Sequence, residues 1–216
     1  GGFAGTETLL NQRNITANPT ILSGDIGDAG NNTDNCFHVV VGAGNVGLAE
    51  LNGFTITKGN AVPFSPQFIN GFAIKAEEGG AIHLNTASPA IVNCIIRDNY
   101  AIFGSGIHTY NLAATLNIDS CTFLNNKSQN LGAALKFEKG SGTGNVEVKN
   151  CNFKANISNG NGGVACIHGV PARFINCLAS GNRIGSNNQG IFHVMMNATA
   201  TFNDCTIAGN AGVSGC

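Results

Sequence analysis

The sequence predicts an all-β protein that folds as a single right-handed parallel β-helix, a solenoid of about six to eight turns with a more irregular N-terminal part. Three observations lead to this prediction. Very few windows show the apolar spacing of an amphipathic helix. A short motif with a cysteine and an asparagine returns every 26 to 30 residues. Residues of one type also recur at equivalent positions of each copy, as they do where the turns of a solenoid stack.

The composition fits a folded chain with many turns. Of the 216 residues, 43% are apolar, which is enough for a continuous core, and 11% are charged. The 30 glycines and the many asparagines favour frequent changes of chain direction, because both tolerate left-handed backbone conformations. The formal net charge of -1 provides no basic face for nucleic acid, and no apolar run is long enough to span a membrane. We therefore expect neither a nucleic-acid partner nor a membrane span.

The repeated motif places an apolar residue three positions before a cysteine and an asparagine five positions after it, as in FINCLASGN (174–182). We interpret it as part of every turn, because a catalytic motif is expected only once. The cysteine would fill a small buried space, and the asparagine would form a corner and bond to the asparagines of the turns above and below. The two predicted ladders comprise Cys94, Cys121, Cys151, Cys177 and Cys205, and Asn99, Asn126, Asn156, Asn182 and Asn210.

Two strands with one buried face each are expected in every turn. The first surrounds the cysteine, where apolar residues alternate with polar ones. Its inward side chains are expected to be Ile91, Ile96, Ile118, Phe123, Val148, Phe153, Phe174, Ala179, Phe202 and Ile207. The second begins upstream, as in GGAIHL (79–84). Its inward side chains are expected to be Ile82, Leu84, Ile107, Thr109, Leu135, Phe137, Ala165, Ile167, Phe192 and Val194.

The N-terminal part is less regular. Residues 1–50 lack the motif, so we expect irregular turns and a loop there, followed by regular turns over residues 51–216 within the same single domain. A diverged copy of the motif occurs in LNGFTITKGN (51–60). There Phe54 takes the position of the cysteine, and Asn60 comes one residue late.

The segments GGFAGTETLLNQRN, LNGFTITKGNA and IVNCIIRDNYA resemble the secreted right-handed parallel β-helix repeat proteins of Bacteroidetes-type bacteria, within the pectate-lyase-like β-helix superfamily. The chain is also similar, more loosely, to polymorphic outer-membrane-protein repeats. The resemblance covers nearly the whole chain and implies the solenoid fold and an extracellular or cell-surface location. Such proteins serve as adhesins, surface-layer parts and glycan-active modules, so the resemblance does not assign an activity.

The columns beside the cysteines were searched for the carboxylates that carbohydrate-active β-helices would need. A hydrolase of this fold would need paired aspartates on adjacent strands, and no two carboxylates stack there. The lone His-Gly of CIHG (166–169) and the residues Arg97 and Arg173 lack such partners. We therefore expect a protein that is not an enzyme and has no cofactor, apart from a possible structural calcium ion.

One outward column contains unusual residues, and two interpretations of it remain open. His83 and His108 should be neighbours on adjacent turns and could bind a metal ion or a sugar. A zinc site normally has three or four ligands, so we favour a solvated polar strip. The column comprises His83, His108, Lys136, Cys166 and His193.

The loop SGDIGDAGNNTDN (23–35) is rich in oxygen ligands. Asp25, Asp28 and Asp34 could hold a structural calcium ion, although the spacing is not that of an EF-hand. An ordinary series of turns is the alternative.

Three cysteines, Cys36, Cys166 and Cys216, lie outside the ladder, whose members are expected to be mostly buried thiols. Their odd number leaves two arrangements open. One is an internal pair with one free thiol, and the other pairs Cys36 with Cys216 of a neighbouring molecule.

These features favour a non-enzymatic extracellular structural protein that assembles head to tail into a filament or forms part of a longer surface rod. The sequence shows no segment that would cap the open ends of the solenoid, and uncapped ends invite stacking. The alternative is a glycan-binding or adhesive surface module that uses exposed residues such as Tyr100, His108 and Tyr110. A polysaccharide lyase or glycoside hydrolase is the less favoured alternative.

Overall fold

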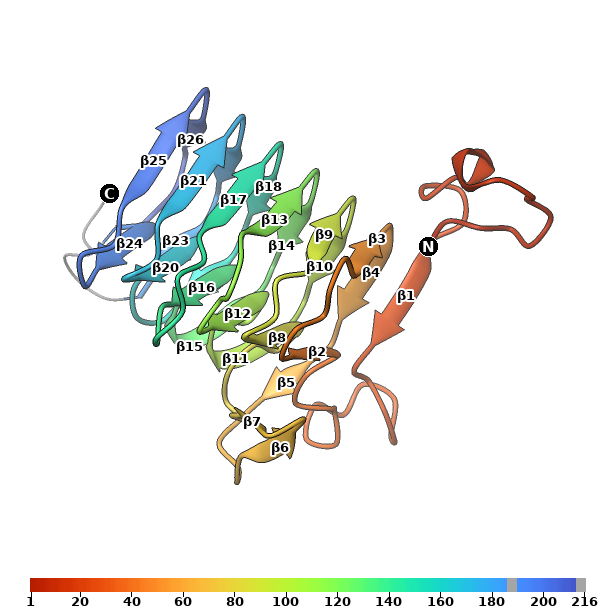
Figure 1. Cartoon of the computed structure of the whole chain (residues 1–216), viewed down its shortest axis with the longest axis horizontal. Coiled ribbons are helices and arrows are strands. Elements are labelled where there is room, and N and C mark those ends of the chain that lie inside the picture. The colour runs from red at the N-terminus through yellow and green to blue at the C-terminus, as the bar shows by residue number, and fades with distance from the viewer. Residues whose placement is uncertain (186–189, 213–216) are drawn as a thin grey trace.

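The computed structural model describes residues 1–185 and 190–212, and nearly all of their regular structure is β-strand. Short parallel strands stack along one axis, so that the chain winds into a β-solenoid (Figure 1). The one helix among the described residues is the short 3-10 turn η1 (Leu10–Gln12). The predicted all-β parallel solenoid is therefore confirmed.

Two of the four parallel sheets meet at the corner that carries the asparagines. Sheet A has the order β1 (Thr20–Ser23), β4 (Phe54–Thr57), β10 (Ile95–Arg97), β14 (Thr122–Leu124), β18 (Asn152–Lys154), β22 (Leu178–Ser180) and β26 (Thr206–Ala208). Sheet D has the order β5 (Asn60–Ala61), β11 (Tyr100–Phe103), β15 (Lys127–Leu131), β19 (Ile157–Ser158) and β23 (Arg183–Ile184).

The other two sheets complete the walls. Sheet B has the order β2 (Val40–Ala43), β8 (Ile82–Asn85), β12 (Ile107–Tyr110), β16 (Leu135–Glu138), β20 (Ala165–His168) and β24 (Phe192–Met195). Sheet C has the order β3 (Glu50–Asn52), β9 (Ala90–Val92), β13 (Leu116–Asp119), β17 (Val146–Lys149), β21 (Ala172–Ile175) and β25 (Ala200–Asn203). An antiparallel hairpin of β6 (Gln67–Ile69) and β7 (Phe72–Ile74) is inserted between β5 and β8.

The regular solenoid has about four turns, fewer than the six to eight predicted. Over residues 90–195, each turn contributes one strand to every sheet, in the order C, A, D and B. The turn before it follows the same order but is interrupted by the β6–β7 hairpin, and β1 and β2 form an incomplete turn. The repeat in the sequence therefore extends further than the regular geometry.

The core lies inside the four walls and consists of stacked columns. Ile107 pairs in register with Ile82 on one side and with Leu135 on the other, as the sequence alignment predicted. The rings of Phe123 and Phe153 stack at 4.9 Å between centroids. The inward columns are confirmed as buried through most of the solenoid. Val194, Phe202 and Ile207 are exceptions, because they belong to the last described turn and no described strand stacks beyond them.

The diverged N-terminal copy joins the same columns. Thr55 pairs with Ile95, which places Phe54 level with Cys94 as predicted. Asn60 pairs with Tyr100, so Gly59 takes the place of the ladder asparagine in this turn. The register thus extends the columns into the interrupted turn.

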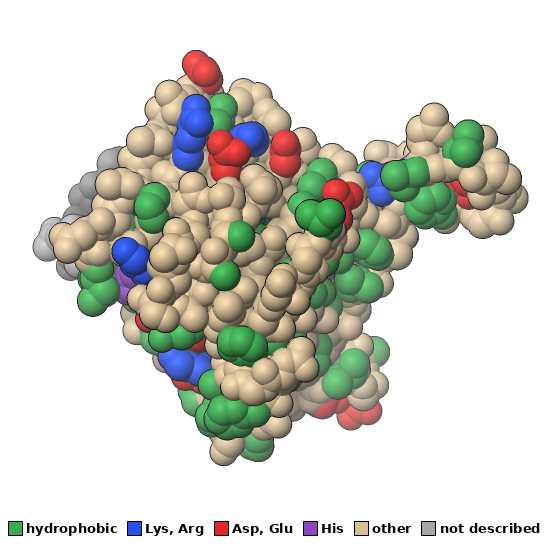
Figure 2. Space-filling view, viewed as in Figure 1, with side chains coloured by type: hydrophobic (Ala, Val, Ile, Leu, Met, Phe, Trp, Pro, Cys, Tyr) green, Lys and Arg blue, Asp and Glu red, His purple; other side chains and the backbone are tan. Residues whose placement is uncertain are grey.

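The surface carries few charges. On the face drawn in Figure 2, basic and acidic side chains lie interspersed over a surface of mostly uncharged atoms. The loop that carries η1 projects from the solenoid at the β1 end (Figure 1). None of the helical structure in the described ranges has the length and apolar character needed to cross a bilayer.

Candidate functional site

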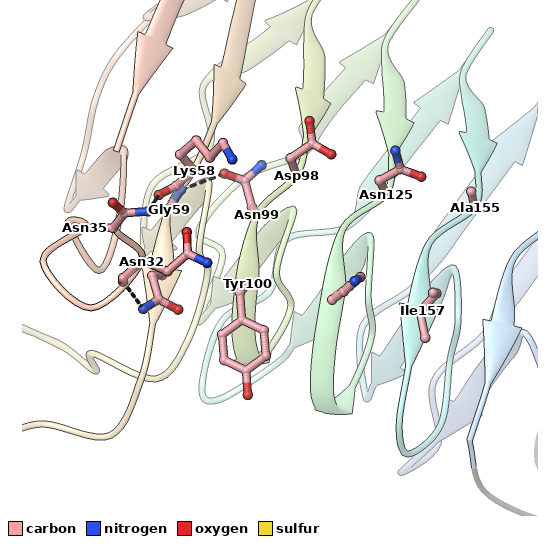
Figure 3. Close-up of a pocket in the computed structure, with 12 residues that line it drawn as sticks. Asn32, Asn35, Lys58, Gly59, Asp98, Asn99, Tyr100, Asn125, Ala155 and Ile157 are labelled. Atoms are coloured by element: carbon pink, nitrogen blue, oxygen red, sulfur yellow. Dashed lines mark hydrogen bonds between the residues drawn. The ribbon is translucent and has the colours of Figure 1, made fainter. Parts of the chain in front are cut away.

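A groove of about 620 Å³ runs along the corner between sheets A and D (Figure 3). Successive turns each contribute a corner segment to it, so the groove follows the axis of the solenoid. A loop that precedes β2 closes one end of it. The lining residues are Asn32, Asn35, Lys58, Gly59, Asn60, Asp98, Asn99, Tyr100, Asn125, Lys127, Ala155 and Ile157.

Left-handed backbone at one residue per turn shapes this corner. Lys58, Asp98, Asn125 and Ala155 have φ values of 66°, 56°, 54° and 55°. In the regular turns the ladder asparagine follows directly after this residue. The prediction that the asparagine itself bends the chain was therefore wrong by one position, because the bend occurs at the residue before it. The side chain of the bending residue is left on the outside, where it lines the groove.

The asparagine ladder lies directly beneath the groove. The Nδ2 of Asn126 donates to the Oδ1 of Asn156 at 3.0 Å and to the carbonyl of Ile96 at 2.9 Å. The Oδ1 of Asn126 accepts from the Nδ2 and the backbone N–H of Asn99. Equivalent amide-to-amide bonds continue from Asn156 to Asn182 and from Asn182 to Asn210. Because the donors and acceptors of each amide find partners, the column can be buried at little cost.

The groove presents amides, a phenol and two ammonium groups. The hydroxyl of Tyr100 donates to the Oε1 of Gln129 at 3.2 Å, which holds the ring at the side of the groove. Asp98 is paired with Arg97 at 2.6 Å, so its charge is compensated. Lys58 lies at one corner of the row and Lys127 at another. Such a surface suits a ligand with many hydroxyl groups and a negative charge.

The cysteine ladder lies inside the solenoid, away from the groove. Its five members are free thiols. The Sγ of Cys151 lies 3.0 Å from the carbonyl oxygen of Lys149, two residues earlier in the chain, and the other four make the equivalent contact at 3.2 to 3.3 Å. The thiols therefore act as small core side chains whose weak donors are satisfied.

The column on the outer side of sheet B is not a solvated strip. His83, His108, Lys136 and Cys166 are all buried, so that prediction was wrong. The reason is a glycine column with positive φ, in which Gly79, Gly104, Gly132 and Gly162 precede the strands of sheet B. These glycines carry the backbone close over the column.

Steric contacts show why this cover needs glycine. A Cβ placed on Gly104 would lie 3.0 Å from the Cβ atoms of both His108 and Lys136. The predicted face of the strand is correct for this column, but the repeat does not reveal that the backbone covers it. Among the described residues, His83 and His108 join Glu78 in the one group of three potential metal ligands whose atoms lie within 4.8 Å of one another.

Two of the three aspartates of the predicted calcium loop accept backbone hydrogen bonds within the loop. Asp34 accepts from the backbone N–H of Asp28 at 2.8 Å, and Asp25 accepts from that of Gly30 at 3.2 Å. Asp25, Asp28 and Asp34 do not form a compact group of three ligands in the described part of the chain. A calcium ion in this loop stays a prediction.

The cysteines outside the ladder lie apart. Cys36 precedes β2 and Cys166 lies in β20, and both are free thiols. Burial raises the pKa of Cys166 to about 12, so this thiol is protonated at neutral pH. Cys216 falls outside the described residues, so the predicted pairing of Cys36 with another molecule stays a prediction.

The aromatic and histidine residues expected to bind glycan do not form one face. Tyr100 lines the groove, whereas Tyr110 lies at the end of β12 in sheet B. The expectation of an exposed His108 was wrong, because its side chain is fully buried. Tyr100 instead shares the groove with three residues that were not predicted as site residues, Lys58, Asp98 and Lys127. Asp98 and Lys127 lie directly beside ladder asparagines, which is a signal that could have identified them.

The comparison with known proteins identified no relative. No family model, curated protein or solved structure matches the chain.

Proposed function

We propose that the protein is a non-enzymatic extracellular module that binds an extended oligosaccharide in the groove between sheets A and D. The observation that carries this proposal is the arrangement of polar corner residues in a row along the axis of the solenoid. Stacked turns lie about 4.8 Å apart. This spacing is close to the length of one pyranose unit in an extended chain, so equivalent corners can meet successive sugars.

The side chains of the groove favour an acidic glycan. The amide of Asn125 can bond to sugar hydroxyls, and the ring of Tyr100 can pack against the apolar face of a pyranose. Lys58 and Lys127 would bind carboxylate or sulfate groups, because the one carboxylate that lines the groove, Asp98, is already paired with Arg97. We therefore propose a polysaccharide that contains uronic acids or sulfate esters.

Binding of a glycan is favoured over its hydrolysis because the groove has too few carboxylates for catalysis. Glycoside hydrolysis commonly uses two carboxyl groups on either side of the bond that is cleaved. Among the lining residues that the structure describes, Asp98 is the one acidic side chain. We also propose that the protein is related to the secreted β-helix repeat proteins that it resembles. This resemblance supports an extracellular location.

A glycan array with uronic-acid, sulfated and neutral oligosaccharides tests the proposal. We expect binding to the acidic members, and Tyr100→Ala should weaken it by about two- to tenfold, since one aromatic contact contributes about 0.5–1.5 kcal/mol. Tyr110→Ala is the matched control, because Tyr110 is exposed on another face. Absence of binding to every glycan, or equal binding by both variants, would contradict the proposal.

A second candidate is head-to-tail assembly. Phe192, Phe202 and Ile207 line an apolar hollow of about 440 Å³ on the last described turn. A second copy or a further turn of the chain would cover it equally well. Sedimentation over a wide concentration range distinguishes the two, because only assembly gives larger species at higher concentration. A monomer at all concentrations would remove this candidate and leave the groove proposal intact.

A further inference from the structure

A compact group of ionisable side chains is enclosed between sheet B and the segment that follows the β6–β7 hairpin. His83 and His108 occupy neighbouring turns in direct register, and their rings stack at 5.2 Å between centroids. Their exposed fractions are 1% and 0%. Glu78, which comes from the covering segment, is also buried and brings its Oε2 to 3.4 Å from the Nδ1 of His108.

Hydrogen bonds determine which ring nitrogens are available. The Nδ1 of His83 lies 3.0 Å from the backbone oxygen of Glu78, which can only accept, so this nitrogen carries the proton. The Nε2 of His108 lies 3.6 Å from the Oε2 of Glu138, which can only accept, and 3.5 Å from the ammonium of Lys136, which can only donate. These two side chains occupy the Nε2 side of the ring, and a metal ion on Nδ1 would select the form with the proton on Nε2. The remaining nitrogens, Nε2 of His83 and Nδ1 of His108, are buried without a hydrogen-bond partner in the described structure.

This arrangement has the features of a metal site. Histidine ligands usually donate their second ring nitrogen to a carbonyl or carboxylate, which fixes the tautomer and leaves the other nitrogen for the metal. One ligand atom from each of Glu78, His83 and His108 lies within 4.8 Å of the other two. We propose that these three residues bind a divalent transition-metal ion of the zinc class, with two imidazole nitrogens and one carboxylate oxygen.

The charges near the site are compatible with a cation. Burial lowers the pKa of both histidines to about 4, so both are neutral, the form that binds metal, at pH 7. Lys136 lies 3.5 Å from the Nε2 of His108, but its shorter contact is with Glu138 at 2.7 Å, which balances its charge. Lys75 pairs with Glu78 at 3.1 Å, and its side chain is half exposed and free to turn into solvent.

The site is independent of the groove proposal. It joins β8, β12 and the segment after β7, whereas the groove lies at the corner of sheets A and D. A bound ion would attach the β6–β7 insertion to the wall of the solenoid. It would also satisfy two buried nitrogens that otherwise carry the energetic cost of unpaired polar atoms.

Metal titration of chelator-treated protein tests the proposal. We expect one Zn²⁺ per chain by calorimetry, and a raised unfolding temperature, because a ligand that binds the folded state stabilises it. Co²⁺ should give the visible absorption of a tetrahedral or five-coordinate site without a sulfur-to-metal band. A sulfur band would place the ion at Cys166, whose Sγ lies 3.2 Å from the Nε2 of His168, and would overturn the assignment.

Variants identify the ligands. His83→Gln and His108→Gln should each weaken zinc binding by more than about 100-fold, since loss of an outer partner alone costs about 10- to 100-fold. His193→Gln, a half-buried residue of the same column, should leave it unchanged. If the first two variants do not fold, NMR of the wild-type protein decides, because Zn²⁺ must shift the imidazole signals of His83 and His108. No uptake of zinc, or uptake that all variants share, would overturn the proposal.

Discussion

Two buried polar columns run along the same solenoid, and they differ in chemistry. The asparagine ladder repeats one residue from Asn99 to Asn210, and each amide bonds to the next. The column of sheet B changes at every turn, from His83 to His108, Lys136, Cys166 and His193, although the register is equally regular. Both columns are buried except at their last described members, Asn210 and His193, so burial alone does not distinguish them.

The difference lies in how the buried groups are satisfied. A column of identical amides completes its own hydrogen bonds, because each amide is both donor and acceptor. A column of unlike residues cannot, and it depends on groups from elsewhere, such as Glu78 and Glu138. In a repeat protein, a buried column of identical residues therefore indicates a structural role. A buried column of unlike residues is where a binding site should be sought.

Among the single substitutions, the largest effect is expected from Asn126→Leu in the uniform column. The leucine has the same branched four-atom side chain but removes the acceptor for two donors of Asn99 and the donor to Ile96. At about 1–3 kcal/mol for each buried group left unpaired, we expect a loss of about 4 kcal/mol of unfolding free energy. Urea unfolding followed by circular dichroism measures it.

Asn117→Leu provides the matched control for this substitution. Asn117 is an exposed asparagine of β13, in the same turn, and the same change there should alter stability by less than about 0.5 kcal/mol. Equal losses at the two positions would show that the buried ladder contributes nothing beyond packing.

The next effect is a pH dependence to which His83 and His108 of the variable column contribute. The folded-state pKa of His83 and of His108 is about 4, below the ordinary value of 6.5, chiefly because of burial. Between these values the unfolded chain binds more protons than the folded chain, so stability falls as the pH is lowered from about 7 to 4. The loss is about 3 kcal/mol for each histidine when complete.

Urea unfolding of metal-free protein at pH 7.5, 6 and 5 measures this dependence. The neighbouring groups His38, Lys75, Glu78, Lys136 and Glu138 contribute to the local field, and the pKa of Glu138 is lowered by its hydrogen bond to His108. The double variant His83→Gln/His108→Gln should make the curve less steep above pH 5, with the remaining slope due to histidines such as His38, whose pKa burial also lowers. Stability that does not change over this range in the wild-type protein would contradict the assignment of both histidines as buried and neutral.

The sequence predicted the uniform column better than the variable one, for a physical reason. Alternating apolar residues and a recurring Cys and Asn identify the inward face, because equivalent side chains of stacked turns must touch. The burial of His83 depends instead on Gly79, whose left-handed backbone brings the chain back over the strand. Glycine precedes the second strand in every copy, but its spacing alone does not tell where the covering segment lies.

Glu78 illustrates what a repeat cannot predict. It stands directly before Gly79, in register with Phe103, Leu131 and Asn161 of the following turns. Because these equivalent residues are of unlike types, the repeat gives no reason to expect an acidic ligand at this position. The groove is a more favourable case, since Asp98 and Asn125 stand directly before ladder asparagines. Its shape still depends on a loop before β2, including Asn32 and Asn35, that lies outside the repeat.

The smallest effect is expected from Lys136→Met, which replaces a buried polar residue of the variable column. The methionine stem can keep the packing against the ring of Phe103, which now lies 4.6 Å from the ammonium group. Glu138 is partly exposed and can regain water when its partner is removed, so the loss of unfolding free energy should be about 1 kcal/mol or less. Unlike Asn126→Leu, this change leaves no chain of amides incomplete.

Lys136→Met should also change the pKa of His108 in the proposed metal site. The ammonium of Lys136 lowers the pKa of His108, so its removal should raise that pKa, and NMR titration of the imidazole signals would show the direction. Lys154→Met is the control, because Lys154 is exposed on β18 in sheet A. If Lys136→Met cost as much stability as Asn126→Leu, the variable column would be as structural as the ladder, and the distinction between the two columns would fail. A small cost with a raised pKa would instead show that Lys136 is retained for its effect on the histidines.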